Sequence, residues 1–71
     1  MTTEIKAPMP GAIIEIYISE GDDVEELQDV LILEAMKMEN VISSKHSGKV
    51  KEVLVKVGDK VATNQVLVVL E

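Results

Sequence analysis

The sequence repeats itself at a constant offset of 37 residues. Residues 11–34 align with residues 48–71 without a gap, and eight of the 24 aligned positions are identical. Several other positions exchange one aliphatic side chain for another, as in Ile13 with Val50. Each half holds too few short strands to close a core alone, so the two halves must face each other. The repeat therefore predicts a single domain, residues 1–71, with quasi-twofold symmetry.

Short bursts of Val, Ile and Leu follow one another along the chain. They cover residues 13–18, 30–33, 50–57 and 66–70. Pro and Gly residues at 8–11 and Gly-Asp pairs at 21–22 and 58–59 separate the bursts and are typical of turns. Because Asp22 and Asp59 occupy equivalent corners of the repeat, we interpret them as turn formers. These patterns predict an all-β fold, a flattened barrel or sandwich of two small antiparallel sheets.

Both halves share an irregularity in their apolar spacing. Apolar positions step by three residues and then by two, at 13, 16 and 18 and again at 50, 53 and 55. A strand alternates its faces every residue, so a step of three shifts the phase. The pattern predicts a β-bulge or a bend at the same place in each half.

Composition and charge narrow the class of partner. The chain has a net charge of −6, one aromatic residue, Tyr17, and no cysteine. Nucleic acid and anionic membranes require a basic surface, so neither is an expected partner. No apolar run reaches the roughly 18 residues of a membrane span, and the first four residues lack the features of a signal peptide. We expect a cytoplasmic protein without thiolate metal sites.

The segment from Ala35 to Asn40 bridges the two aligned halves and has no counterpart in the alignment. It links the strand-like residues 31–34 with Val41 and Ile42, close enough to form one hairpin with Met36 and Lys37 at its tip. Tight two-residue hairpins favour Asn or Gly, and neither Met nor Lys suits a positive φ. Such a conflict between local preference and geometry is typical of a functional site.

Residues 34–40, Glu-Ala-Met-Lys-Met-Glu-Asn, resemble the biotin-attachment motif of the biotinyl/lipoyl carrier domains. The resemblance extends to the turn at Ala7–Gly11 and to the Gly-Asp and Gln positions of both halves. It implies two four-stranded antiparallel sheets with the modified lysine on an exposed hairpin tip. It also implies that Lys37 carries covalent biotin on its ε-amine.

Two positions depart from the family pattern. The family usually places Gly before the Gln of each half, whereas this chain has Leu27 and Asn64 there. Asn tolerates left-handed backbone at small cost, but Leu does not. We therefore expect a strained or remodelled turn at Leu27.

The resemblance assigns Lys37 as the substrate of a ligase and not as a catalytic residue. An exposed lysine amine is protonated at neutral pH, so the ligase must remove its proton before attack. Met36 and Met38 are expected to frame Lys37 as part of the cofactor-binding tip. Two thioethers alone make a weak copper(I) site, so no metal is expected.

Three further residues of the motif are candidates for ligase recognition. They are Glu34, Ala35 and Glu39. Glu34 and Glu39 are also open to a second interpretation, as solubilising charges at strand ends. The acidic run at residues 20–26 is interpreted as a solvated face, with steering toward a basic partner as the alternative. His46 has no catalytic partner at a suitable spacing and is predicted to lie in a loop.

Three functions are compatible with these residues. The first is a biotin carrier, loaded by a biotin protein ligase and serving a biotin carboxylase and a carboxyltransferase. The second is a lipoyl carrier, or an acceptor of both groups, which would add a lipoyl ligase. Lipoyl domains usually have Asp before the lysine and Ala or Val after it, so Met36 and Met38 favour biotin. The third is an unmodified interaction module. In each case we expect a monomer.

Overall fold

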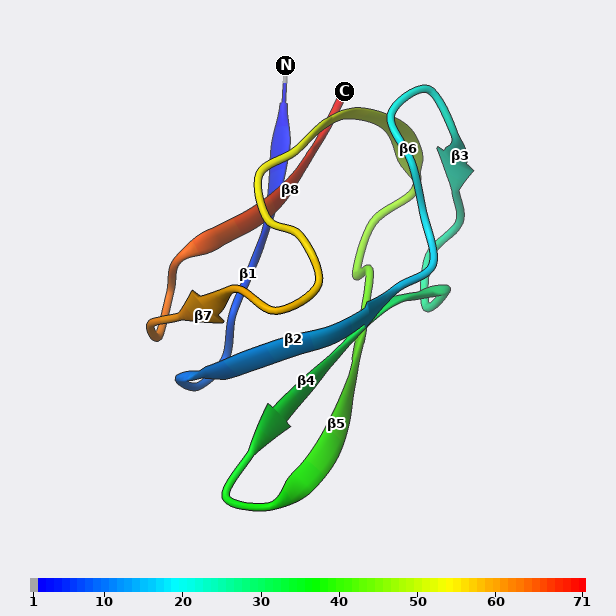
Figure 1. The fold of residues 1–71 in the computed structure, drawn as a ribbon. Coiled ribbons are helices and arrows are strands. Elements are labelled where there is room, and N and C mark those ends of the chain that lie inside the picture. The colour runs from blue at the N-terminus through cyan, green and yellow to red at the C-terminus, as the bar shows by residue number, and fades with distance from the viewer. Residues whose placement is uncertain (1) are drawn as a thin grey trace.

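The computed structural model describes residues 2–71, which form eight β-strands and no helix (Figure 1). The strands are β1 (Thr3–Lys6), β2 (Gly11–Ile16), β3 (Asp23–Val24), β4 (Asp29–Ala35), β5 (Met38–Ser43), β6 (Gly48–Val53), β7 (Lys60–Val61) and β8 (Val66–Leu70). None of the described segments is a helix that could cross a membrane.

The strands assemble into two four-stranded antiparallel sheets, which confirms the predicted fold class. One sheet has the order β1-β8-β6-β3 and the other β5-β4-β2-β7. Strands from the first half of the chain pair with strands from the second in both sheets, as β1 does with β8 and β2 with β7. Neither half forms a complete sheet without the other, so the two halves depend on each other to fold.

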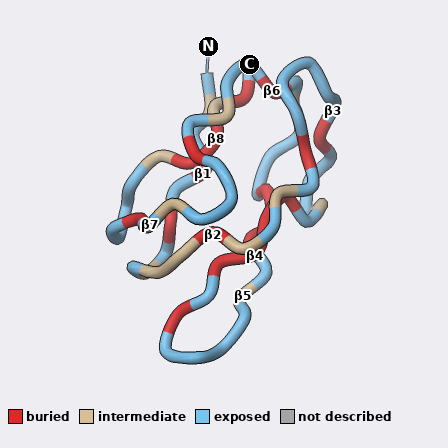
Figure 2. The backbone as a smooth tube through the Cα atoms, viewed as in Figure 1, coloured by how far each residue is buried: buried red, intermediate tan, exposed pale blue. Residues whose placement is uncertain are grey.

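The core is built from equivalent positions of the two halves (Figure 2). The buried pairs that differ by 37 residues are Ile5 and Ile42, Ala7 and Ser44, Ile13 and Val50, Ile18 and Val55, Val24 and Val61, Val30 and Leu67, Leu31 and Val68, and Leu33 and Leu70. Apart from Ala7 and Ser44 these are Val, Leu and Ile side chains, and removing each of them from water stabilises the fold by roughly 1.5–3 kcal/mol. The aliphatic pattern of the repeat is thus the core itself.

The predicted bulges are present in both halves. The register of β2 against β4 shifts between Ile13 and Glu15, and the register of β6 against β8 shifts between Val50 and Glu52. Beyond the bulges the strands are shorter than the apolar bursts, because β2 ends at Ile16 and β6 at Val53. Two further apolar residues, Ile18 and Val55, remain buried although they lie outside the strands.

The Gly-Asp corners use equivalent hydrogen bonds. Gly21 N donates to Val50 O at 2.8 Å, and Gly58 N donates to Ile13 O at 2.7 Å. Each aspartate closes its own turn: Asp22 Oδ2 accepts from Ser19 N at 2.9 Å, and Asp59 Oδ2 accepts from Lys56 N at 3.0 Å. Asp22 and Asp59 are turn formers, as predicted.

The turn at Leu27 is not remodelled. Leu27 has φ of 70° and Asn64 has φ of 67°, so the two turns adopt the same left-handed backbone. The following glutamines also act alike, since Gln28 and Gln65 each accept a backbone hydrogen bond at 2.9 Å within the turn. Leu27 therefore adopts a conformation that costs an L-residue with a Cβ about 1–2 kcal/mol.

Strands β1 and β5 extend the correspondence beyond the aligned residues. An offset of 37 places Thr3–Lys6 on residues 40–43, within β5. Ala7 and Ser44 then make equivalent bonds: Ala7 N donates to Gln65 O and Ser44 N donates to Gln28 O, both at 2.9 Å. This correspondence is not visible in the sequence, because only Ile5 and Ile42 are identical in this stretch.

Candidate functional site

The hairpin between β4 and β5 has a two-residue tip, as predicted. Ala35 pairs with Met38 in the last rung, and Met36 and Lys37 form the turn. Their φ angles are 54° and 63°, so both residues lie in the left-handed region. Two consecutive positive φ angles match the twist of a tight hairpin, but here neither residue is Gly or Asn. The conflict foreseen between residue type and geometry is therefore present at this tip.

The tip projects away from the body of the domain. In Figure 1 it forms the end of the molecule farthest from the two termini, and Figure 2 shows it as exposed backbone. Met36 is 93% exposed, and Lys37 and Met38 are also exposed. The two methionines flank the lysine without covering it. The ε-amine of Lys37 is thus presented to solvent on a fixed turn.

Two carboxylates face each other on the rung below the tip. Glu34 of β4 pairs directly with Glu39 of β5, and both side chains are exposed. Like charges opposite each other in a sheet destabilise the pairing by roughly 0.2–1 kcal/mol. Ala35, in contrast, is nearly buried on the inner side of the hairpin. The pairing of the two carboxylates therefore does not stabilise the hairpin.

Two residues without an assigned role in the sequence hold the hairpin in place. Asn40 Nδ2 donates to Met38 O at 3.2 Å and to Leu33 O at 3.4 Å, which ties the two strands together near the tip. Gly11 lies against β4, where an added Cβ would collide with the carbonyl oxygen of Glu34. The position of Gly11 at the start of the repeat is a sequence signal for this close approach.

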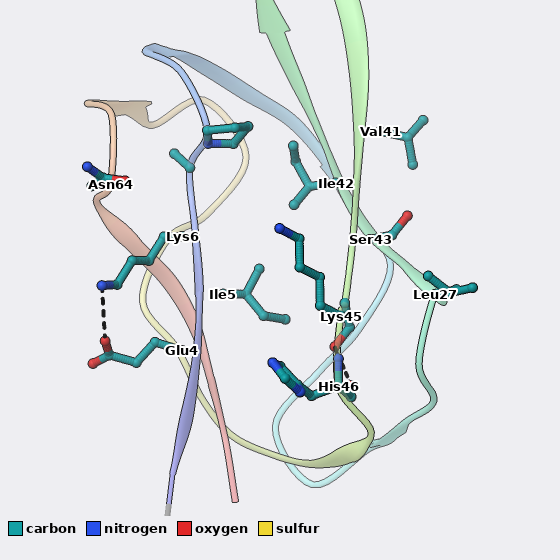
Figure 3. Close-up of a pocket in the computed structure, with 13 residues that line it drawn as sticks. Glu4, Ile5, Lys6, Leu27, Val41, Ile42, Ser43, Lys45, His46 and Asn64 are labelled. Carbon is teal, nitrogen blue, oxygen red and sulfur yellow. Dashed lines mark hydrogen bonds and ion pairs between the residues drawn. The ribbon is translucent and has the colours of Figure 1, made fainter.

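A separate groove of about 560 Å³ lies between the edge strands β1 and β5 (Figure 3). Ile5 and Ile42 face into it from opposite sides, and Lys45 extends between them. His46 lies at one end, in the loop after β5 as predicted, where its backbone bonds to Ser44 Oγ. Lys37 does not line this groove, so the hairpin tip is a projecting site and not an enclosed one.

Within the residues that the structure describes, no three His, Cys, Asp or Glu side chains are grouped as metal ligands. The chemistry available at the hairpin is that of one exposed primary amine between two thioethers and two carboxylates. Such an amine is a nucleophile once it is deprotonated, and nothing in the fold covers it. The geometry fits covalent attachment of an acyl group to Lys37 by an external enzyme.

Residues 3–70 match the Biotin_lipoyl family model, described as biotin-requiring enzyme. This match covers nearly the whole chain. The chain belongs to the biotin-requiring enzyme family. The lysine hairpin and paired four-stranded sheets described above are therefore features of a family member, and the expectation drawn from residues 34–40 is confirmed at the level of the family.

Relatives of this family member are carboxylases. It is 47% identical over 60 residues to a pyruvate carboxylase of Aspergillus niger, an alignment covering 84% of this chain and 5% of that protein. It is 42% identical over 67 residues to the mitochondrial propionyl-CoA carboxylase alpha chain of Sus scrofa, covering 94% and 9%. Among solved structures, the urea carboxylase of Kluyveromyces lactis matches with a TM-score of 0.92 and 32% identity, covering 100% of this chain and 6% of that one.

The chain thus corresponds to a small part of these large proteins, between 5% and 9% of their length. The part that it matches is a biotin-carrying domain, which is a carrier and not a catalytic unit.

Proposed function

We propose that this protein is a biotin carrier whose attachment residue is Lys37. The observation that supports the proposal is the exposed, left-handed tip formed by Met36 and Lys37. The chain has seven lysines. An amine chosen among seven must be recognised by its position, and a rigid two-residue turn provides that position.

In this mechanism the ligase removes a proton from Lys37 Nζ. The free electron pair of Nζ then attacks the acyl carbon of activated biotin, an amide bond forms, and the bond to the activating group breaks. Biotin, once attached, supplies the atom that carries a carboxyl group. The domain contributes the long lysine arm on a rigid body, which raises the effective concentration of the carrier at successive active sites.

Biotin is favoured over lipoate because the relatives reported above are carboxylases and because Met36 and Met38 flank the lysine. We infer that the partners are a biotin protein ligase, a biotin carboxylase and a carboxyltransferase. We propose that catalysis belongs to those proteins and that this domain is their carrier. We also infer a monomer, because the two sheets cover each other's aliphatic faces.

The test is the intact mass of the protein after co-expression with a biotin protein ligase. We expect one biotinyl increment on wild type and on Lys45→Arg, and none on Lys37→Arg. Lys45 is the control because it is an exposed lysine at another site of the fold.

Unmodified wild type under biotin-replete conditions, or labelling of Lys37→Arg, contradicts the proposal. Incubation with a lipoyl ligase in place of the biotin ligase tests the alternative, for which a lipoyl increment on wild type would be required.

A further inference from the structure

The outer side of the sheet that contains the hairpin has an apolar strip bordered by carboxylates. We name this surface the hairpin face; it consists of Glu15, Tyr17, Ile32, Glu34, Glu39 and Val41. Ile32 pairs with Glu15 on β2 and with Val41 on β5, so these three side chains share one side of the sheet. Ile32 does not belong to the core cluster, whereas its neighbours Leu31 and Leu33 do.

The close-up of the groove confirms the side on which Val41 lies. Figure 3 shows Ile42 and Val41 on opposite sides of the β5 ribbon, and both residues line the groove. Val41 lies on the edge strand β5 and is 52% exposed. Ile32 is only 9% exposed, so the apolar surface that the hairpin face offers to a partner comes from Val41 and Tyr17.

Tyr17 supplies the aromatic part of the hairpin face. It is the only aromatic residue of the chain and is 49% exposed. Partial desolvation raises the pKa of its phenol, and the negative charge of Glu15, a hydrogen bond to Glu15 and the more distant charges of Asp29 and Glu39 raise it further. The phenol thus lies among carboxylates from β2, β4 and β5, at the border between the apolar strip and the acidic rim.

The other half of the repeat provides an internal comparison. Leu54 corresponds to Tyr17 and is 46% exposed, and Glu52 corresponds to Glu15. The strands differ in charge, however. Lys6, Lys49 and Lys51 lie on β1 and β6, whereas the sheet β5-β4-β2-β7 contains one lysine, Lys60 on its edge strand β7. Glu15, Glu34 and Glu39 therefore make the hairpin sheet acidic on the strands nearest Lys37, and Lys60 adds a positive charge at its far edge.

We propose that the hairpin face is the surface on which the loading ligase docks, through a complementary patch of apolar residues bordered by Lys or Arg. This inference rests on the proposed function. The ligase is the favoured occupant because it meets Lys37 before any cofactor arm is attached. Its active site must reach Nζ directly, so its surface contacts the strands next to the tip. Apolar contact then supplies affinity, and the acidic rim supplies orientation and association rate.

Matched charge reversals test the acidic rim. Glu15→Lys and Glu52→Lys make the same substitution at equivalent exposed positions and change the net charge equally. We measure kcat/KM for labelling by a purified biotin protein ligase with ATP and biotin. Glu15→Lys is expected to lower kcat/KM by about tenfold, and Glu52→Lys by less than about twofold. Added salt is expected to bring the kcat/KM values of the two variants closer together, because it screens the charges.

A second pair of variants tests the apolar strip. Tyr17→Ala is expected to lower kcat/KM about fivefold, whereas Leu54→Ala, equally exposed on the other half, leaves it unchanged. Circular dichroism and thermal unfolding of all four variants verify that each is folded.

The outcomes separate the two proposals. If wild type is labelled and both members of each pair behave alike, the docking surface is wrong and the carrier function stands. If folded wild type is not labelled at all, the carrier function itself fails. A loss confined to Glu15→Lys and Tyr17→Ala supports the hairpin face as the docking surface.

Discussion

Among residues 2–71, four residues other than glycine adopt left-handed backbone. They are Leu27, Met36, Lys37 and Asn64. Only Asn64 is a residue type that tolerates the conformation well. Met36 and Lys37 belong to the proposed attachment site, where a fixed turn serves recognition. Leu27 is 75% exposed and has no such role, so its side chain gains little from burial to offset the strain.

Exchanging the residue types at the two equivalent turns tests this strain. Leu27→Asn is expected to raise the free energy of unfolding by about 1 kcal/mol, because Asn relieves the left-handed penalty. Asn64→Leu is expected to lower it by a similar amount. Thermal or urea unfolding of both variants measures the effect, and a decrease in stability for Leu27→Asn would show that the Leu side chain contributes packing.

Tyr17 allows a measurement of the electrostatics of the hairpin face. Desolvation and the adjacent Glu15 raise its pKa above 10.0, so the folded state favours the neutral phenol. The stabilisation from Tyr17 is complete at pH values below the pKa of its phenol in the unfolded chain. It is lost as the pH rises through the higher pKa of the phenol in the folded state. Because Tyr17 is the only tyrosine and the chain has no Trp, tyrosinate absorbance reports it alone. Glu15→Gln is expected to lower the pKa; an unchanged pKa would place Glu15 away from the phenol.

At the scale of the element, the hairpin has Met36 and Lys37 in a turn whose positive φ angles favour other residue types. Replacing Met36 and Lys37 with Asn and Gly would supply the residues that this turn prefers. We expect the free energy of unfolding to rise by about 1–2 kcal/mol and labelling to be abolished. Chemical denaturation and intact mass measure the two effects. A turn that gains no stability from Asn-Gly would mean that Met36 and Lys37 are not strained.

The sequence pattern predicts most of the strands, and the strands that it misses share a physical reason. Aliphatic bursts predict β2, β4, β6 and β8, because these strands build the core and their side chains are constrained. The repeat predicts the bulges, since a phase shift leaves a trace in both halves. Strand β1 carries a single buried residue, Ile5, and the two-residue strands β3 and β7 carry one each, so no periodic pattern arises.

The candidate site is also partly readable from the sequence. The seven residues 34–40 predict the hairpin and its tip because the motif is local. The bracing role of Asn40 and the outer position of Ile32 are not readable, because they depend on the register between strands. Tyr17 lies 20 residues before Lys37, and it is brought beside the hairpin sheet by the pairing of β2 with β4 and by the hydrogen bond that Tyr17 N donates to Val30 O.

At the scale of the whole molecule, strands of one half pair with strands of the other half. This arrangement predicts that the domain unfolds in a single cooperative transition. Leu33 and Leu70 are equivalent, fully buried residues in different sheets. Truncating either to Ala is expected to cost about 2–5 kcal/mol through the cavity left behind. Each variant should unfold in one step that is coincident by far-ultraviolet circular dichroism and by tyrosine fluorescence. A second transition in either variant would show that one half folds independently.

The pairing of β1 with β8 brings the first and last strands together, with Thr3 opposite Leu70. The domain is elongated, 33 Å along its longest axis, and Figure 1 shows the lysine hairpin at the end opposite the termini. A linker attached to either terminus would therefore join the domain at the end opposite the hairpin. Rotation of the domain about such a linker would move Lys37 over the largest distance that the domain allows, and the linker would not obstruct its approach to an active site.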